Sequence, residues 1–199
     1  MKRIIMHWTA GAHKANNTDL KHYHRVYEKD GKMVPGVHLI SANTGKLVSG
    51  KYAAHTLNCN TDSIGLSMAC MFNATEKDFG TYPMTEAQFE AMCKDAAALC
   101  VEYGIKVTNK TVLSHAEVQP NLGITQKGKW DFTVLPFNGM KGAKTCGDYA
   151  RKRVQAYIDG AAKTPVKQPD PVKPEPKPEP KPEQSFWQWL LSIIFGVGK

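Results

Sequence analysis

A proline-rich segment near the end of the chain places the strongest limit on its fold. Between residues 163 and 184 Lys and Glu alternate with eight of the twelve prolines, and no aliphatic cluster is present. Such a segment has too little apolar surface to offset the entropy of ordering, so it predicts an extended linker. It could also serve as a docking ligand, but the regular Pro-Glu-Pro-Lys repeat favours a spacer. We therefore expect a globular domain over residues 1–162, a Pro/Lys/Glu-rich linker over 163–184 and a tail over 185–199.

The tail is short and strongly apolar. As a helix, residues 186–197 would be ~18 Å long against ~30 Å of bilayer hydrocarbon, too short to cross. Its polar residues form one narrow stripe, which predicts an amphipathic helix lying in a membrane interface; a helix packed back on the globule is the alternative. The side chains expected to contact the membrane are Phe186, Trp187, Trp189, Leu190, Ile193, Ile194 and Phe195.

Charge and cysteine content restrict the class of protein. The 199 residues carry 26 Lys plus Arg against 18 Asp plus Glu, a formal net charge of +8. This excess favours an anionic partner such as nucleic acid, anionic lipid or a cell-wall polymer, or else a solvated basic surface. The globular part lacks a run of basic residues interleaved with aromatic ones, so we do not expect nucleic-acid binding. Five cysteines without a Cys-x-x-Cys pair predict free thiols and a reducing compartment.

Within residues 1–162, short apolar segments alternate with helical patterns. A capping box that begins at Thr85 starts a helix, and Gly104 ends it. Strands are expected over 3–8, 63–71 and 111–114, a hairpin over 25–27 and 32–34, and a last helix over 147–158. The mixture predicts an α/β domain with a single mixed β-sheet flanked by helices, followed by the linker and a short apolar C-terminal helix.

Two histidines follow the same local pattern. His7 stands near the end of an apolar strand, and His115 comes directly after another. Side chains at the ends of adjacent strands lie at the rim of a sheet, where two imidazoles could supply two metal ligands. A histidine at a strand end can equally be a hydrogen-bonded surface residue. The pattern alone leaves both interpretations open.

Five motifs occur in a fixed order along the globular part. They are HWTAG, Tyr-His before an Asp-Gly turn, HTLNCNTDSIGL, SHAEVQP and GKWD. Together they resemble the zinc-dependent N-acetylmuramoyl-L-alanine amidases, the family of amidase-type phage lysozymes and peptidoglycan recognition proteins. The resemblance extends over residues 7–136. The linker and the apolar tail lie outside it and fit a phage or prophage endolysin.

The resemblance implies a Zn²⁺ cofactor with three protein ligands. His7 and His115 match the two histidine ligands, and Asp131 matches the third, two residues beyond a catalytic lysine. Two imidazoles and a carboxylate leave the fourth tetrahedral position for water, as catalytic zinc requires. The alternative for Asp131 is a helix or turn cap.

The same comparison implies catalytic roles for two residues. Lys129 and Tyr23 match family positions that stabilise the oxyanion of the reaction; Tyr23 could otherwise be an aromatic residue of the core. His24 and His55 match positions near the cleft, for which we expect outer-shell or substrate-contact roles.

One position departs from the family pattern. Several members carry a glutamate on the central strand as a general base, and Ser67 stands there in this chain. Glu28 and Glu117 are close in sequence to candidate site residues, although neither matches the motif. The base could also be the zinc-activated water itself.

The resemblance implies an endolysin, a peptidoglycan hydrolase that cleaves the amide between N-acetylmuramic acid and L-alanine with zinc-activated water. The alternative is a non-catalytic peptidoglycan-binding module, which loss of a zinc ligand would indicate; all three candidate ligands are present. We expect a monomer that is made in the host bacterial cytoplasm without a signal peptide and acts on the cell wall after release.

Overall fold

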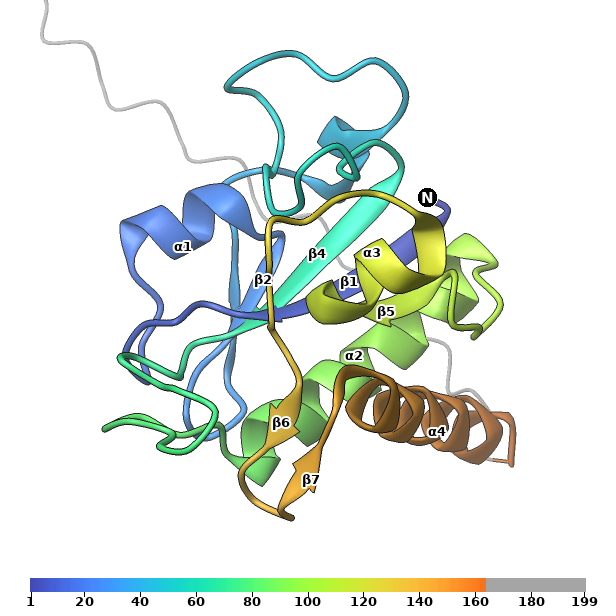
Figure 1. Ribbon diagram of the computed structural model, residues 1–199. Helices are drawn as coiled ribbons and strands as arrows, with labels where there is room; N and C mark the ends of the chain where they lie inside the picture. The colour runs from blue at the N-terminus through green and yellow to red at the C-terminus, as the bar shows by residue number, and fades with distance from the viewer. Residues whose placement is uncertain (164–199) are drawn as a thin grey trace, which may run out of the picture. The chain divides into compact units, whose positions relative to one another are not determined.

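The computed structural model describes residues 1–163, and its centre is a five-stranded sheet in the order β3-β2-β4-β1-β5 (Figure 1). Strand β4 pairs in parallel with β1 and β2, β1 pairs in parallel with β5, and β3 runs antiparallel to β2. The strands are β1 (Arg3–Trp8), β2 (Arg25–Tyr27), β3 (Met33–Pro35), β4 (Ser63–Met68) and β5 (Val112–Ser114). The predicted α/β class with one mixed sheet is confirmed. The predicted linker and tail helix lie outside the described residues.

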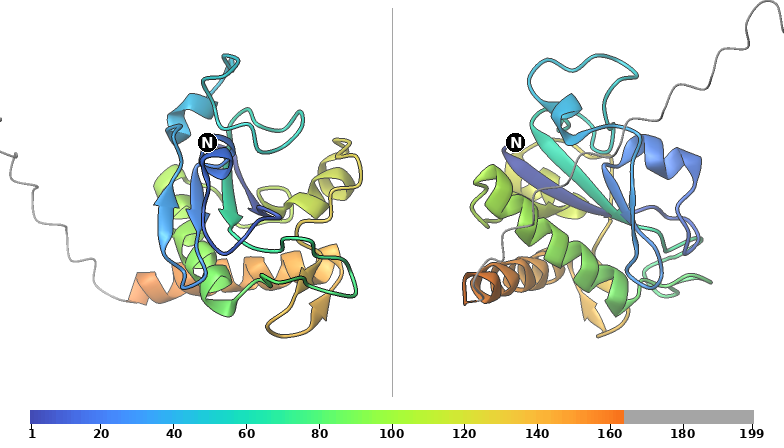
Figure 2. Two further views of the ribbon diagram at one scale, coloured as in Figure 1. Left: turned by 90° about the vertical axis from the view of Figure 1, so that its left-hand side faces the viewer. Right: turned by 180° about the vertical axis from the view of Figure 1, so that it is seen from behind.

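Helices cover both faces of this sheet. In the rear view of Figure 2, α2 (Glu86–Tyr103) and α4 (Ala143–Lys163) lie in front of the sheet, whereas α3 (His115–Leu122) lies in front of β5 in Figure 1. The smaller elements are α1 (Asn17–His22), a 3₁₀ helix η1 (Ile40–Asn43) and a hairpin of β6 (Val134–Leu135) and β7 (Met140–Lys141). None of the helices within the described residues is long and apolar enough to cross a bilayer.

Strand β1 shows how the sheet separates the core from the polar face. Because successive side chains point to opposite faces, Ile4 and Met6 join the main core beneath α2 and α4, whereas His7 points to the other face. On β4, His7 is paired with Ser67 in register. The face that carries His7 is therefore lined by small and polar residues of β4, which leaves room for a site.

Three helices, α1, α2 and α3, begin at capping boxes that the sequence contains. The side chain of Thr85 accepts a hydrogen bond from the Gln88 N–H and that of Gln88 accepts one from the Thr85 N–H, and α2 ends at Gly104 with φ 63°. The predicted boundaries of this helix are confirmed. Asn16 and Asp19 cap α1 in the same way, so the sequence contains a start signal for this helix, which was not predicted.

Some predicted boundaries are wrong. Strand β4 ends at Met68 instead of residue 71. Helix α4 begins at Ala143 instead of Gly147. Gly147 lies against Glu117 of α3, where an added Cβ would lie 2.0 Å from the buried carboxylate. Helix α3 was not predicted, and Pro120 lies in its last turn. All five cysteines are buried and free, as expected.

Candidate active site

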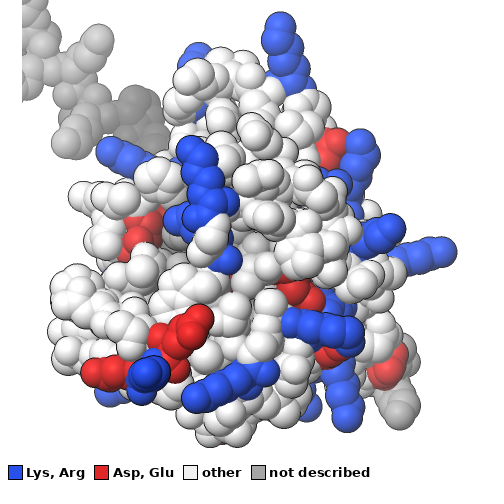
Figure 3. All heavy atoms as spheres, in the orientation of Figure 1, with Lys and Arg blue, Asp and Glu red and all other residues white. Residues whose placement is uncertain are grey.

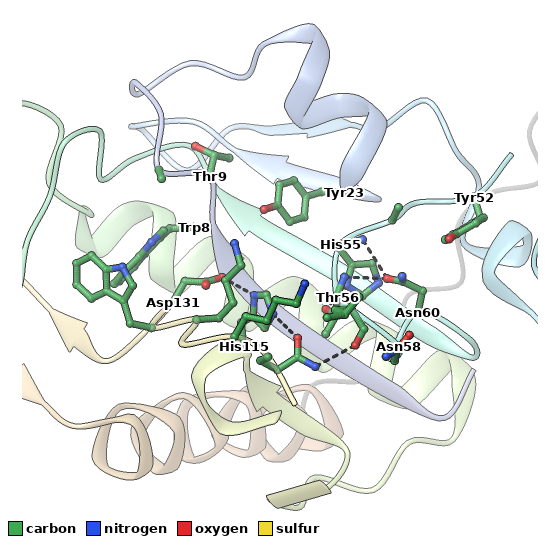
Figure 4. A pocket seen from close by; sticks show the side chains of 17 residues that line it. Trp8, Thr9, Tyr23, Tyr52, His55, Thr56, Asn58, Asn60, His115 and Asp131 are labelled. Atoms are coloured by element: carbon green, nitrogen blue, oxygen red, sulfur yellow. Dashed lines mark hydrogen bonds and ion pairs between the residues drawn. The ribbon is translucent and has the colours of Figure 1, made fainter. Parts of the chain in front are cut away.

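A pocket of about 560 Å³ opens at the carboxyl ends of β1 and β5 (Figure 4). Its wall comes from the residues at the end of β1, residues 52–60 and residues 126–131, together with Tyr23 and His115. The carboxyl ends of parallel strands are a common position for ligand sites, because the loops that follow the strands gather there. His7 and His115, the two histidines at strand ends, are thus brought to one place.

Three buried side chains converge at this pocket: His115 and Asp131 line it, and the fully buried His7 contacts both. The Nδ1 atoms of His7 and His115 are 3.1 Å apart, and Asp131 Oδ2 lies 2.9 Å from the first and 3.0 Å from the second. Ligand atoms about 2.0–2.1 Å from a tetrahedral zinc ion are separated by roughly 3.3 Å, close to these spacings. The donor set also suits zinc chemically. His7, His115 and Asp131 form the one group of this kind among the described residues.

The protonation states favour ligation. Burial lowers the pKa of His7 to about 4, despite the hydrogen bond to Asp131, so its imidazole is neutral at pH 7. Burial alone would raise the pKa of the Asp131 carboxyl, but hydrogen bonds with His115 and His7 outweigh it and lower that pKa below its ordinary value. Asp131 is therefore ionised, and a cation would find one negative charge and the neutral imidazole of His7.

The tautomer of His115 follows from its neighbours. Gln126 Nε2 donates to the carbonyl oxygens of Leu57 at 2.9 Å and Ile124 at 3.3 Å, which turns the amide oxygen toward His115. His115 Nε2 lies 2.9 Å from that oxygen and must donate to it. With a metal in the site, the proton would then stay on Nε2, and the lone pair on Nδ1 could bind the metal beside Asp131 and His7.

His7 meets polar partners on its far side as well. Its Nε2 lies 3.3 Å from both Thr56 Oγ1 and His55 Nδ1, and these two atoms are 2.8 Å apart. His55 is buried against β4, where a Cβ on Gly65 would lie 2.4 Å from the imidazole ring. Burial lowers the pKa of His55 well below its ordinary value, and so does the adjacent His7.

Tyr23 and Lys129 both line the pocket. The Tyr23 ring lies 5.2 Å from that of His7, and its hydroxyl faces the pocket interior in Figure 4. Burial raises the pKa of Tyr23, and the charge of Asp131 raises it further, so the hydroxyl stays protonated and can donate a hydrogen bond. Lys129 is exposed, and its positive charge contributes to the lowered pKa of His7.

A sequence profile of the N-acetylmuramoyl-L-alanine amidase family (Amidase_2) matches residues 1–132. The chain belongs to this family. The match covers about two thirds of the chain and contains His7, His115, Asp131, Tyr23 and Lys129. No curated protein is significantly similar to the whole sequence.

Solved structures place this amidase-family domain among known folds. The Staphylococcus aureus hydrolase AmiA, solved with its ligand, superimposes with a TM-score of 0.53 at 13% identity over 82% of this chain and 76% of its own. The Escherichia coli N-acetylmuramyl-L-alanine amidase AmiD, solved with the substrate anhydro-N-acetylmuramic acid-L-Ala-D-gamma-Glu-L-Lys, gives 0.41 at 18% identity over 58% of this chain and 48% of its own. The Ph2119 endolysin of a Thermus scotoductus bacteriophage gives 0.39 at 16% identity over 58% and 71%. AmiA thus shares the fold of this domain.

The amidase-family domain has no second carboxylate in its pocket. Among the described lining residues Asp131 is the sole acid. Glu117 is 2% exposed and bound to Arg151, and Glu28 accepts a hydrogen bond from the Ala15 N–H; neither lines the pocket. Ser67 is buried beside His7 and close to Tyr23, where a hydrogen bond from its hydroxyl acts against the raised pKa of the tyrosine. The hypothesis that Glu28 or Glu117 acts as base finds no support in this arrangement.

The two histidines predicted to lie near the cleft, His24 and His55, differ in their position relative to the pocket. His55 lines the pocket, whereas His24 lies outside the lining. His24 Nδ1 accepts from the Gly65 N–H at 2.9 Å, and its Nε2 donates to Asn43 Oδ1 at 3.1 Å. Gln126 was not predicted as a site residue, because no motif contains it. Thr56, which follows His55 in one of the motifs, was not predicted either.

Proposed function

We propose that this chain is a zinc-dependent peptidoglycan hydrolase of the endolysin type, which cleaves the amide between N-acetylmuramic acid and L-alanine. The observation that carries the proposal is the convergence of His7, His115 and Asp131 at a pocket that Tyr23 and Lys129 also line. The amidase family of residues 1–132 supports this choice of bond. The Nδ1 atoms of both histidines face the Asp131 carboxylate, at 2.9 and 3.0 Å.

Hydrolysis adds water across the amide: oxygen bonds to the carbonyl carbon, the C–N bond breaks, and the amine leaves with a proton. Zinc, when bound, would supply a Lewis acid that activates the attacking water and polarises the carbonyl. Tyr23 offers a protonated hydroxyl, and Lys129 a positive charge, to the oxyanion that forms at the carbonyl. Asp131 would be occupied as a metal ligand, which leaves Tyr23 and Lys129 as the donors that stabilise the transition state.

A non-catalytic peptidoglycan-binding module would need no such donor set. In this chain every candidate metal ligand is present, buried and within 4.8 Å of the others. The two functions differ in one measurable property, since a binding module leaves the peptidoglycan intact. Product analysis therefore separates them.

The test is mass spectrometry of purified peptidoglycan fragments after incubation with zinc-loaded protein. We expect free L-alanine amino termini and muramic acid residues with a free lactyl carboxyl group. Lys129→Ala and Tyr23→Phe should each lower turnover by about 10² while zinc stays bound, because single oxyanion donors contribute about that much. Lys152→Ala, an exposed lysine on α4, serves as the control. Bound but uncleaved peptidoglycan would instead identify a binding module.

A further inference from the structure

We infer that a single turn, residues 55–60, orients both histidine ligands, with Thr56 and Asn60 as positioning residues. The inference rests on the zinc site of the proposed function. It concerns the side of each imidazole that faces away from the metal. Outer-shell partners of this kind fix the ring and the tautomer of a ligating histidine.

The turn is held by one amide side chain. Asn60 Oδ1 accepts hydrogen bonds from the backbone N–H groups of His55 at 3.0 Å and Thr56 at 2.8 Å. The Asn60 carbonyl in turn accepts from Asn43 Nδ2 at 3.1 Å, and Asn43 is paired with both backbone groups of Ala53. The turn is thus anchored at both ends, which fixes where the next two groups point.

The first of these groups is the Thr56 hydroxyl, which reaches His7. It lies 2.8 Å from His55 Nδ1 and 3.3 Å from His7 Nε2. A hydroxyl that donates to His55 has its oxygen free to accept from His7. His7 then carries its proton on Nε2, and its Nδ1 lone pair faces the metal site.

The second group is the Leu57 carbonyl, which reaches His115 through Gln126. It accepts a hydrogen bond from Gln126 Nε2 at 2.9 Å, and the other end of that amide accepts from His115 Nε2 at 2.9 Å. Adjacent residues of one turn therefore control two imidazoles that are 108 positions apart in sequence. The turn acts as a common support behind both ligands.

The ring protons can be observed by NMR. In ¹⁵N-labelled protein with one equivalent of zinc at pH 7.5, long-range ¹⁵N–¹H correlations show which ring nitrogen carries the proton. We expect the Nε2–H form for both His7 and His115, hydrogen-bonded to Thr56 and Gln126 respectively. Thr56→Val should disturb the signals of His7 and not those of His115, Gln126→Leu those of His115 and not those of His7, and Asn60→Ala both. Thr56→Ser and Asn60→Asp keep the acceptor oxygens and should resemble the parent protein.

Zinc affinity gives a second readout, by competition with a chromogenic chelator. Thr56→Val should weaken binding by about 10- to 100-fold, the usual effect of losing an outer-shell partner. Thr145→Val, an exposed threonine of α4, should not change it. If Thr56→Val does not fold, Thr56→Ala against Thr56→Ser makes the same comparison.

Unchanged His7 signals and zinc affinity in the Thr56 variants would overturn the inference and assign the contact to His55. Parent protein that binds no zinc would refute the proposed function instead. In that case the His115 Nε2–H signal of zinc-free protein, compared between the parent, Gln126→Leu and Asn60→Ala, still decides the role of the turn.

Discussion

At the scale of single residues, the site depends on the absence of large side chains from one face of β4. Gly65 lets the His55 ring lie against the strand, where any Cβ would collide with it at 2.4 Å. On the same face, Ser67 places a small side chain beside His7, where several family members carry a longer acid. Small residues on this strand therefore create the space that the histidines occupy.

Buried histidines make the stability of the domain sensitive to acid. Burial lowers the pKa of both His24 and His7 to about 4, whereas an unfolded histidine titrates near its ordinary value of 6.5. Between these values the unfolded state binds more protons than the folded state, so the unfolding free energy falls as the pH decreases from 6.5 to 4. Each group contributes up to about 3 kcal/mol over this range.

Urea unfolding of zinc-free protein at pH 7 and pH 4.5 measures this effect. His24→Gln should reduce the difference between the two pH values, whereas His22→Gln, an exposed position, should leave it unchanged. Equal unfolding free energies of the parent protein at both pH values would contradict the account.

The sequence predicted the candidate metal ligands and catalytic residues better than the residues that hydrogen-bond to them. His7, His115, Asp131, Tyr23 and Lys129 belong to ordered motifs, and the structure brings all five to one place. Gln126 could not be predicted, because its role depends on the carbonyl of a residue 69 positions away. Contacts of this kind come from the path of the loops, which local patterns do not encode.

At the scale of elements, α3 and α4 are joined by a buried ion pair. Arg151 binds both carboxylate oxygens of Glu117, at 2.8 and 2.9 Å, and donates to the Val112 carbonyl of β5 at 2.9 Å. Glu117 also caps the start of α3, where it accepts from the Ser114 N–H. The first residue of that helix is His115, so this pair fixes the element that delivers the ligand.

Removal of one partner should leave a buried charge without compensation. Arg151→Ala is expected to lower the unfolding free energy by about 3–5 kcal/mol in urea titrations. Arg153→Ala breaks a more exposed pair with Glu90 and should cost about 1 kcal/mol or less. Similar losses of unfolding free energy in the two variants would show that the buried Arg151–Glu117 pair contributes no more to stability than the more exposed Arg153–Glu90 pair.

Strands were easier to predict than short helices. The boundaries of β1 follow from a compact apolar run, those of β2 from the hairpin around an Asp-Gly turn, and those of α2 from a capping box and a terminal glycine. Helix α3 has only eight residues and contains Pro120, so its apolar pattern is too short to predict a helix. The sequence does contain its Ser114–Glu117 capping box and the terminal Gly123, and Val118 packs against Ile5 of β1.

At the scale of the whole molecule, the excess positive charge is dispersed over the visible face. Figure 3 shows Lys and Arg spread across the described part of this face, with Asp and Glu between several of them. The net charge of +8 is therefore not gathered into one patch there. This distribution suits general attraction to an anionic cell wall more than docking of one anionic ligand.

The three-part organisation, the monomeric state and release from the host cytoplasm stay predictions. The tail can be tested with lipid vesicles, because burial of seven large apolar side chains at about 1.5–3 kcal/mol each, less the cost of partial immersion, gives measurable binding. Full-length protein should sediment with vesicles, and a chain that ends at residue 162 should stay folded and remain in solution. A full-length protein that ignores vesicles, together with a shortened chain that unfolds, would show a docked helix instead.

The central claim is that His7, His115 and Asp131 hold a zinc ion on which hydrolysis depends. The most direct measurement is the peptidoglycan-hydrolysing activity of protein stripped with a chelator and titrated with zinc. We expect activity to vanish on stripping and to return in proportion to zinc, with saturation at one equivalent, while His115→Ala stays inactive at the same zinc concentration. Full activity in protein shown by metal analysis to contain no zinc would contradict the account.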